Sequence, residues 1–242
     1  MGERRGRVQH IVFCFAPHLH RFHCPSISKI FCIWVRNVND WSHHERLAVL
    51  GIDRSINFIW VLNMNPGVEF HIIFPGEAIP QAYFRTRFEI LRQPIGMPEG
   101  SERLADDNDA IHCYATVEDR IIAVGRLHLI PESSDGEAKD HDGPGATTIP
   151  AFGPLSSNDS LCRPAVQIRQ MGTVADQRRK GFAKQLLRLL EESGQAYFQA
   201  KAGFLQAREI ALDFYQQSGW EIIDEPYSIG KIGLHRSMMK RF

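Results

Sequence analysis

The passage from residue 165 to residue 193 constrains the fold of this chain more than any other. Ala165–Val174 is predicted to form a strand. After a short basic loop, Gly181–Ser193 places its apolar residues on one helical face, and Gly194 is a natural C-terminal stop. These apolar residues are Phe182, Leu186, Leu189 and Leu190. A strand that leads directly into such a helix predicts an α/β architecture, with helices packed on the faces of a sheet.

The rest of the chain from Val68 onward extends this pattern. Further strands are predicted at Val68–Phe74, Ile111–Val117, Ile121–Ile130, Gly203–Ala207, Trp220–Ile223 and Ile232–Met239. Two more helices are predicted, Ala78–Arg92 with Phe84, Phe88 and Leu91 on one face, and Arg208–Ser218 with Ile210, Ala211, Phe214 and Tyr215 directed inward. The resulting order predicts a mixed β-sheet flanked by helices, an α/β (α+β) fold.

Residues 131–163 are rich in Ser, Asp, Gly and Pro, and they are predicted to form a long loop. A loop of this length inside a compact domain is either functional or mobile, or it is a tolerated surface insertion. Its acidic side chains suggest, as a hypothesis, attraction for a cationic amine.

The first 63 residues differ from the rest in their pattern of apolar residues, which shows no sustained helical or strand period. We therefore expect an N-terminal extension over 1–63 and one domain over 64–242, and we hypothesise that translation begins at Met64. The extension holds residues that are chemically suited to zinc, but their spacings fit no standard zinc site, so no metal is expected. They are Cys14, His18, His20, His23, Cys24 and Cys32.

Charge and cysteine content exclude several classes of protein. The formal net charge is zero, so the chain has no global field for binding nucleic acid or an anionic membrane. No apolar run is long enough for a membrane span. The five cysteines are odd in number and irregularly spaced, which argues against a disulfide framework and favours a cytoplasmic setting.

The junction between the strand at 165–174 and the following helix is a candidate phosphate site. The start of a helix exposes unpaired N–H groups and the positive end of the helix dipole. Arg178, Arg179 and Lys180 add positive charge there, and Gly181 has no Cβ to keep a ligand away. Neither a P-loop nor a dinucleotide-binding pattern is present. The alternative is a solvated basic turn that precedes a helix.

This junction resembles the acetyl-CoA motif of the GNAT superfamily of N-acetyltransferases. The motif pattern is Arg/Gln-x-x-Gly-x-Gly/Ala, and the chain has Arg178-x-x-Gly181-x-Ala183. Two later segments are also similar to the family: Ala207-Arg208-x-x-Ala211-x-x-Phe214-Tyr215-x-x-x-Gly219-Trp220, and Leu234-His235-Arg236-Ser237-Met238. The helix from Phe84 to Pro94 resembles the first helix of one group of small bacterial-type members. The chain departs from the family in having Leu234 where a proline is usual, and in the length of the 131–163 loop.

The resemblance implies transfer of an acetyl group from acetyl-CoA to a primary amine by direct attack, without a metal. It assigns the cofactor to Gly172, Thr173, Val174, Arg178, Arg179, Lys180, Gly181, Phe182 and Ala183. Tyr215 matches the tyrosine that protonates the departing thiolate. The acceptor would be a small molecule or a peptide, and a homodimer is a family-level expectation. The rival interpretation is a sensor or interaction module of the same fold that binds acyl-CoA without turnover.

The sequence does not decide which residue acts as the general base. The four candidates are Glu89, His128, Gln170 (through water) and Glu225. Arg87 and Arg92 are expected either to line the acceptor pocket or to face solvent. His235 is expected either to line that pocket or to be a satisfied strand histidine.

Overall fold

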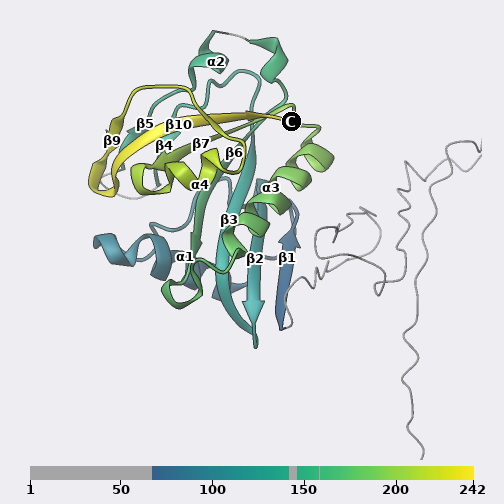
Figure 1. Ribbon diagram of the computed structural model, residues 1–242, viewed down its shortest axis with the longest axis vertical. Helices are drawn as coiled ribbons and strands as arrows, with labels where there is room; N and C mark the ends of the chain where they lie inside the picture. The colour runs from purple at the N-terminus through teal and green to yellow at the C-terminus, as the bar shows by residue number, and fades with distance from the viewer. Residues whose placement is uncertain (1–66, 142–145, 158) are drawn as a thin grey trace, which may run out of the picture. The chain divides into compact units, whose positions relative to one another are not determined.

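The computed structural model describes residues 67–141, 146–157 and 159–242 (Figure 1). The predictions for residues 1–63 therefore lie outside the described residues. The main sheet has the strand order β1-β2-β3-β6-β7-β10-β8, with β9 paired to β10. Neighbouring strands are antiparallel except β6 and β7, which are parallel. The mixed sheet flanked by helices confirms the predicted fold class.

The strands of this sheet are β1 (Val68–Ile73), β2 (Ile111–Val117), β3 (Arg120–Ile130), β6 (Ala165–Thr173), β7 (Ala202–Arg208), β8 (Glu221–Ile222), β9 (Tyr227–Ile229) and β10 (Gly233–Arg241). The α-helices are α1 (Gln81–Leu91), α2 (Gly153–Ser156), α3 (Phe182–Phe198) and α4 (Leu212–Gln216). A separate small sheet joins β4 (Ala138–Lys139) to β5 (Thr148–Ile149).

Helices α1 and α3 cover opposite faces of the sheet (Figure 1). A Cβ added at Gly125 on β3 would lie 2.6 Å from Leu186 of α3. A Cβ added at Gly172 on β6 would lie 2.8 Å from Leu91 of α1. Each glycine thus allows one helix to pack closely against the strand backbone.

Two irregularities open the middle of the sheet. On β6, Gln170 has a positive φ of 52°, and the pairing with β3 shifts by one residue between Val124 and Arg126. This is a β-bulge, which bends a strand and re-aims its side chains. The parallel pairing of β6 with β7 covers only Ala165–Gln167 and Ala202–Phe204, so the C-terminal halves of the two strands are not hydrogen-bonded to each other.

Helix α3 continues past its predicted end. Gly194 lies inside the helix, and Gln199, in the left-handed conformation, is the C-cap. A Cβ at position 194 would lie 3.0 Å from Leu127 on β3. Close contact between helix and sheet therefore accounts for this glycine, and the prediction of a helix stop there was wrong.

The segment predicted as a helix at 208–218 is a 3-10 turn followed by α4, and Ile210 is 89% exposed instead of directed inward. In α1 the buried positions are Tyr83, Phe84, Thr86 and Arg87, whereas Phe88 and Leu91 are partly buried.

The 131–163 region forms part of the core. Phe152, Leu155 and Cys162 are buried there against Phe204 of β7 and Met239 of β10. Phe152 stacks at 4.8 Å from the ring of Phe204. The interpretation of this region as a merely tolerated surface insertion was therefore wrong, because removing it would expose one side of the sheet.

The described residues lack the features of two other kinds of site, a membrane span and a metal centre. They contain no helix long and apolar enough to cross a membrane. They also hold no group of three or more His, Cys, Asp or Glu side chains placed to bind a metal ion.

Candidate active site

A cavity of about 170 Å³ lies where β6 and β7 separate. Side chains from the end of α1, from both strands, from α4 and from β10 line it. Leu91 and Arg92 reach it from the α1 face of the sheet, and Ala211 and Tyr215 from the other side of the opening. The lining of the cavity therefore includes side chains from both sides of the opening.

Tyr215 lies on α4 and is only 9% exposed. Its ring packs edge-on against Phe214 and Trp220, at centroid distances of 5.0 and 6.3 Å. The indole Nε1–H of Trp220 donates to Glu191 of α3 at 2.8 Å, which anchors this cluster to the α3 face. Burial raises the pKa of Tyr215 above its ordinary value of 10, so the side chain stays a neutral phenol.

His235, on β10, also lines the cavity, in agreement with one of its two predicted placements. Its Nδ1–H donates to the carbonyl oxygen of Gly233 at 2.8 Å, which fixes the tautomer and leaves the lone pair on Nε2. Burial lowers the pKa of His235, a backbone hydrogen bond to Gly233 partly opposes this, and the ring is held neutral at pH 7. A neutral imidazole with a free Nε2 is able to accept a proton.

Gln170, at the bulge, lines the same cavity, and both of its buried amide atoms lack hydrogen-bond partners. An unpaired amide in a buried position is unfavourable unless a ligand or a water completes its bonds. Of the four predicted general bases, only Gln170 lines this cavity.

The other candidate bases lie elsewhere. Glu89 and Glu225 are exposed. His128 lies next to Asp106, with 3.8 Å between Nδ1 and the carboxylate, and burial together with Arg126 lowers its pKa to about 3. His235 is a further candidate base that the sequence did not suggest for this role, because its tautomer depends on a backbone carbonyl that no sequence motif reveals.

The predicted phosphate site forms a compact turn at the start of α3. Gly181 is the N-cap, with φ of 86°, and no side chain caps the helix. The N–H groups of the first helical turn are thus left for a ligand or for water. Arg179 and Lys180 are exposed, and Phe182 is buried beneath the turn.

Short contacts hold this turn in place. The Nε–H of Arg178 donates to the carbonyl oxygen of Thr173 at 3.2 Å, which joins the turn to the end of β6. Lys180 donates to the side chain of Gln177 at 2.9 Å. The structure therefore brings Thr173, Arg178, Lys180 and Gly181 together at one end of the opening between the strands.

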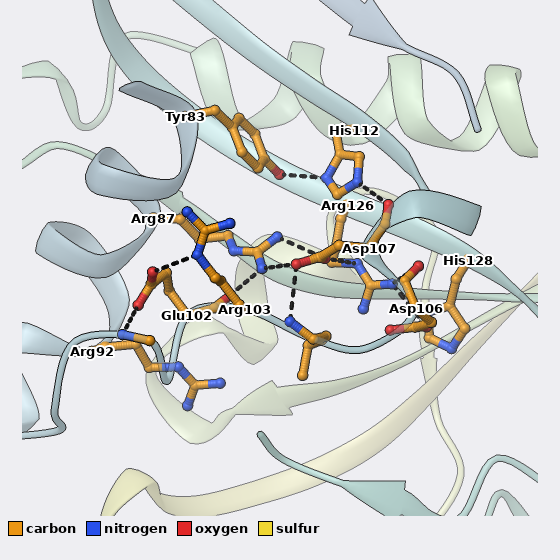
Figure 2. A network of polar contacts seen from close by, with 12 residues as sticks. Tyr83, Arg87, Arg92, Glu102, Arg103, Asp106, Asp107, His112, Arg126 and His128 are labelled. Carbon is orange, nitrogen blue, oxygen red and sulfur yellow. Dashed lines mark hydrogen bonds and ion pairs between the residues drawn. The ribbon is translucent and has the colours of Figure 1, made fainter. Parts of the chain in front are cut away.

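A buried network of charges supports the α1 face behind the cavity (Figure 2). Arg87 is fully buried and forms a bidentate pair with Asp107, at 3.1 and 2.7 Å, so it neither faces solvent nor lines the cavity. Arg126 lies 3.2 Å from the same carboxylate and 2.8 Å from Asp106. Burial raises the pKa of Asp106, but Arg126 and His128 outweigh burial and lower it to about 2.

The same network holds the neighbouring helix and strand together. His112 Nε2–H donates to the carbonyl oxygen of Asp107 at 2.7 Å, and the Tyr83 hydroxyl lies 3.2 Å from Nδ1 (Figure 2). Burial lowers the pKa of His112 to about 4. Because Tyr83, Arg87, Asp107, His112 and Arg126 are all buried and joined to one another, the first role of the network is to fix α1 against β2 and β3.

Comparison with solved structures gives the same fold. Escherichia coli ElaA matches with a TM-score of 0.50 and 17% identity, over 72% of this chain and 99% of that chain. FeeM, an N-acyl amino acid synthase from uncultured soil microbes, matches with a TM-score of 0.50 and 10% identity, over 73% and 93%. Arabidopsis thaliana NAA60 in complex with acetyl-CoA has a TM-score of 0.48 and 14% identity, over 72% and 98%. No curated protein matches the chain by sequence.

The sequence profile of the Acetyltransferase (GNAT) family matches residues 78–220. This match covers more than half of the chain and runs from the residues just before α1 to Trp220, after α4. It includes the bulge, the turn at Gly181 and Tyr215, and so it spans most of the cavity described above. The chain belongs to the GNAT family of acetyltransferases.

Proposed function

We propose that the protein transfers an acetyl group from acetyl-CoA to a primary amine by direct attack, in the cavity between β6 and β7. The observation that carries the proposal is the meeting of Tyr215, Gln170 and His235 around one opening in a GNAT sheet, next to an uncapped helix start. The chemistry needs positioning and two proton transfers, and these side chains are suited to both.

The pyrophosphate of the cofactor would be held at the start of α3, by the N–H groups of Arg179–Ala183 and the charge of Arg178 and Lys180. The backbone of Gly172, Thr173 and Val174 would bind the pantetheine arm in the place of a further strand. Support comes from the geometry of the region, because the turn follows the end of β6 and the adjacent edge of β6 is not paired to β7 beyond Gln167.

In the proposed reaction the amine nitrogen attacks the thioester carbonyl carbon, and the carbon–sulfur bond breaks. His235 Nε2 takes the proton that the amine loses. Tyr215 gives its phenolic proton to the departing sulfur. His235 then releases its proton to solvent and solvent returns one to Tyr215, so that both side chains end in their starting protonation states. Burial raises the pKa of Tyr215, and the same apolar surroundings raise the pKa of a thiol, so the transfer of the proton stays balanced.

Replacing Tyr215 by Phe tests this proposal against a module that binds acyl-CoA without turnover. The Kd for acetyl-CoA, measured by calorimetry, should stay within about twofold, since only one hydroxyl is removed. The rate of thiol release with a panel of primary amines should fall roughly a hundredfold, within the usual range for general acid catalysis. Tight binding by the wild-type protein with no turnover of any amine would favour the module instead.

A further inference from the structure

The α1 side of the cavity carries an excess of positive charge. Three arginines line the cavity in the described part of the chain, and only one carboxylate does. The arginines are Arg92, Arg169 and Arg208, and the carboxylate belongs to Asp140. Since the nearby His235 is held neutral, this lining is electrostatically suited to an anionic group and not to a polycation.

Arg169 lines the cavity without an ion-pair partner among the described residues. Its guanidinium donates to the carbonyl oxygen of Lys139 at 2.7 Å, and no carboxylate of the described residues lies within ion-pair distance of it. Burial and the nearby charge of Arg126 lower the pKa of Arg169 to about 10, although the charges of Asp106 and Asp140 oppose this shift. The side chain is partly exposed, so an anion in the cavity can reach its guanidinium and supply a closer counter-charge.

Arg169 faces the side of the sheet opposite α3. It pairs directly with Arg126 across β3 and β6, and antiparallel partners direct their side chains to the same face. Arg126 lies in the network on the α1 face, where it contacts Asp106 and Asp107 (Figure 2). Arg169 is therefore on the face away from the proposed phosphate site at the start of α3. Along β6 it lies about 13 Å before Thr173, at about 3.3 Å per residue.

Arg92 extends this positive surface at the end of α1. One of its nitrogens donates to the backbone carbonyl of Asp140 at 2.9 Å, and another lies 3.9 Å from the carboxylate. That carboxylate is already engaged, because it accepts from the backbone N–H of Thr147 at 2.6 Å and lies 3.0 Å from His141. Asp140 thus holds Arg92 loosely. The Nε–H of Arg92 is buried without a hydrogen-bond partner.

The cavity also has an apolar part to its lining, which includes the isoleucines at 149, 168, 229 and 232, beside the amides of Gln170 and Gln206. We propose that the acceptor is an amine that also carries a carboxylate, with an apolar body of the size of a small free amino acid, and that Arg169 with Arg92 binds the carboxylate. The forked guanidinium suits a carboxylate by donating two parallel N–H groups. The inference rests on the proposed acetyl transfer and names its substrate class.

The test compares acceptors that differ only in charge. Acetyl-CoA turnover is measured with a panel of free amino acids that includes L-leucine, and with L-leucinamide and 3-methylbutylamine as matched amines without a carboxylate. Phosphoethanolamine is the probe for a phosphate. The kcat/KM of the best amino acid should exceed that of its amide and its decarboxylated amine by roughly tenfold to a hundredfold, as expected for loss of charge-assisted hydrogen bonds. Equal or faster use of the uncharged analogues, or a preference for phosphoethanolamine, would overturn the inference and leave acetyl transfer intact.

Arg169→Gln should remove most of that preference by raising KM for the amino acid, with little effect on KM for the amide. Arg169→Lys keeps the charge without the fork and should be intermediate. Arg188→Gln is the matched control, since Arg188 pairs with Glu192 at 2.5 Å on the exposed side of α3. Thermal unfolding and acetyl-CoA affinity of each variant show whether the fold and the cofactor site survive the change.

A second readout does not depend on turnover. Calorimetry of N-acetyl-L-leucine and N-acetyl-L-leucinamide, in the presence of CoA, should show the acid binding more tightly, and only when Arg169 is present. If no amine is acetylated but the acid still binds through Arg169, the anion site is supported and the proposed enzymatic function fails. If the acid and the amide bind equally, the carboxylate site does not exist.

Discussion

Gly181 allows backbone strain to be separated from ligand binding at the start of α3. Its φ of 86° lies in the left-handed region, and a Cβ built there meets no atom within 4 Å. Gly181→Ala therefore adds strain without a clash. The strain costs about 1–2 kcal/mol, and the reduced freedom of the unfolded chain returns about 0.4–1 kcal/mol. The net loss of about 1 kcal/mol should lower Tm by about 2–4 °C for a domain of this size.

Gly96 offers a matched control away from the cavity. It has φ of 68°, ends the turn after α1, and also has no atom within 4 Å of an added Cβ. Gly96→Ala should lower Tm by a similar amount and leave acetyl-CoA affinity unchanged. The pair Gly181→Trp and Gly96→Trp then adds bulk at each site on a backbone that is equally strained.

Calorimetry of acetyl-CoA with these four variants tests the reasoning. A tryptophan at position 181 would cover the free N–H groups of the first turn, each worth about 1.5–3 kcal/mol to a charged ligand. Its Kd should therefore rise at least roughly tenfold, while Gly96→Trp stays near the wild-type value. Equal affinity in the two tryptophan variants would refute the placement of the pyrophosphate at this helix start.

Three further predictions concern stability. Gly194→Ala should destabilise the domain by about 1–3 kcal/mol in urea, since its Cβ would lie 3.0 Å from Leu127 in a packed interface. Asp107→Ala leaves two buried guanidinium groups with less counter-charge and should destabilise by about 3–5 kcal/mol, with partial recovery when its bidentate arginine partner is also replaced by Met. The lowered pKa values of His112, about 4, and of His128, about 3, mean that the unfolded chain binds more protons below pH 6.5. Stability is thus complete above pH 6.5 and falls as the pH drops, by about 2 kcal/mol per histidine at pH 5; a His128→Gln variant with an unchanged pH slope would contradict this.

The sequence predicted the strands and the order of the elements well, because burial on both faces leaves continuous apolar runs, as in residues 121–124 of β3. It also identified the turn at Gly181, since a glycine between basic residues and a helical pattern is typical of a backbone that turns sharply into a helix. The predicted end of α3 failed for a related reason. A single sequence does not distinguish a glycine that ends a helix from a glycine that lets a helix pack closely on a strand. Only the contact between Gly194 and Leu127 shows that Gly194 is of the second kind.

The charged core of the site could not be predicted. Arginine has a long apolar stem and a head that normally faces water, so Arg87 on an apparent helix surface gave no indication of complete burial. Its partner Asp107 is twenty residues away, in a segment without periodicity. Pairs of this kind depend on how a loop folds back on a helix, and local patterns carry no information about that. His235 could not be proposed as a base from the sequence, because its tautomer is set by the carbonyl of Gly233.

The bulge at Gln170 explains how one strand can serve both faces of the cavity. In a regular strand, residues 169 and 172 would face opposite sides, since their separation is odd. Here Arg169 pairs with Arg126, and Gly172 pairs with Val124. Val124 and Arg126 of β3 are two positions apart, so both face the same side of the sheet, toward α1. The extra residue on β6 therefore reverses the alternation between Arg169 and Gly172. Without the extra residue, Arg169 and Gly172 would face opposite sides of the sheet. Either Arg169 would turn away from the proposed acceptor side, or a residue with a side chain would take the place of Gly172 against Leu91. The positive φ of Gln170 is thus the local strain that allows both requirements to hold at once.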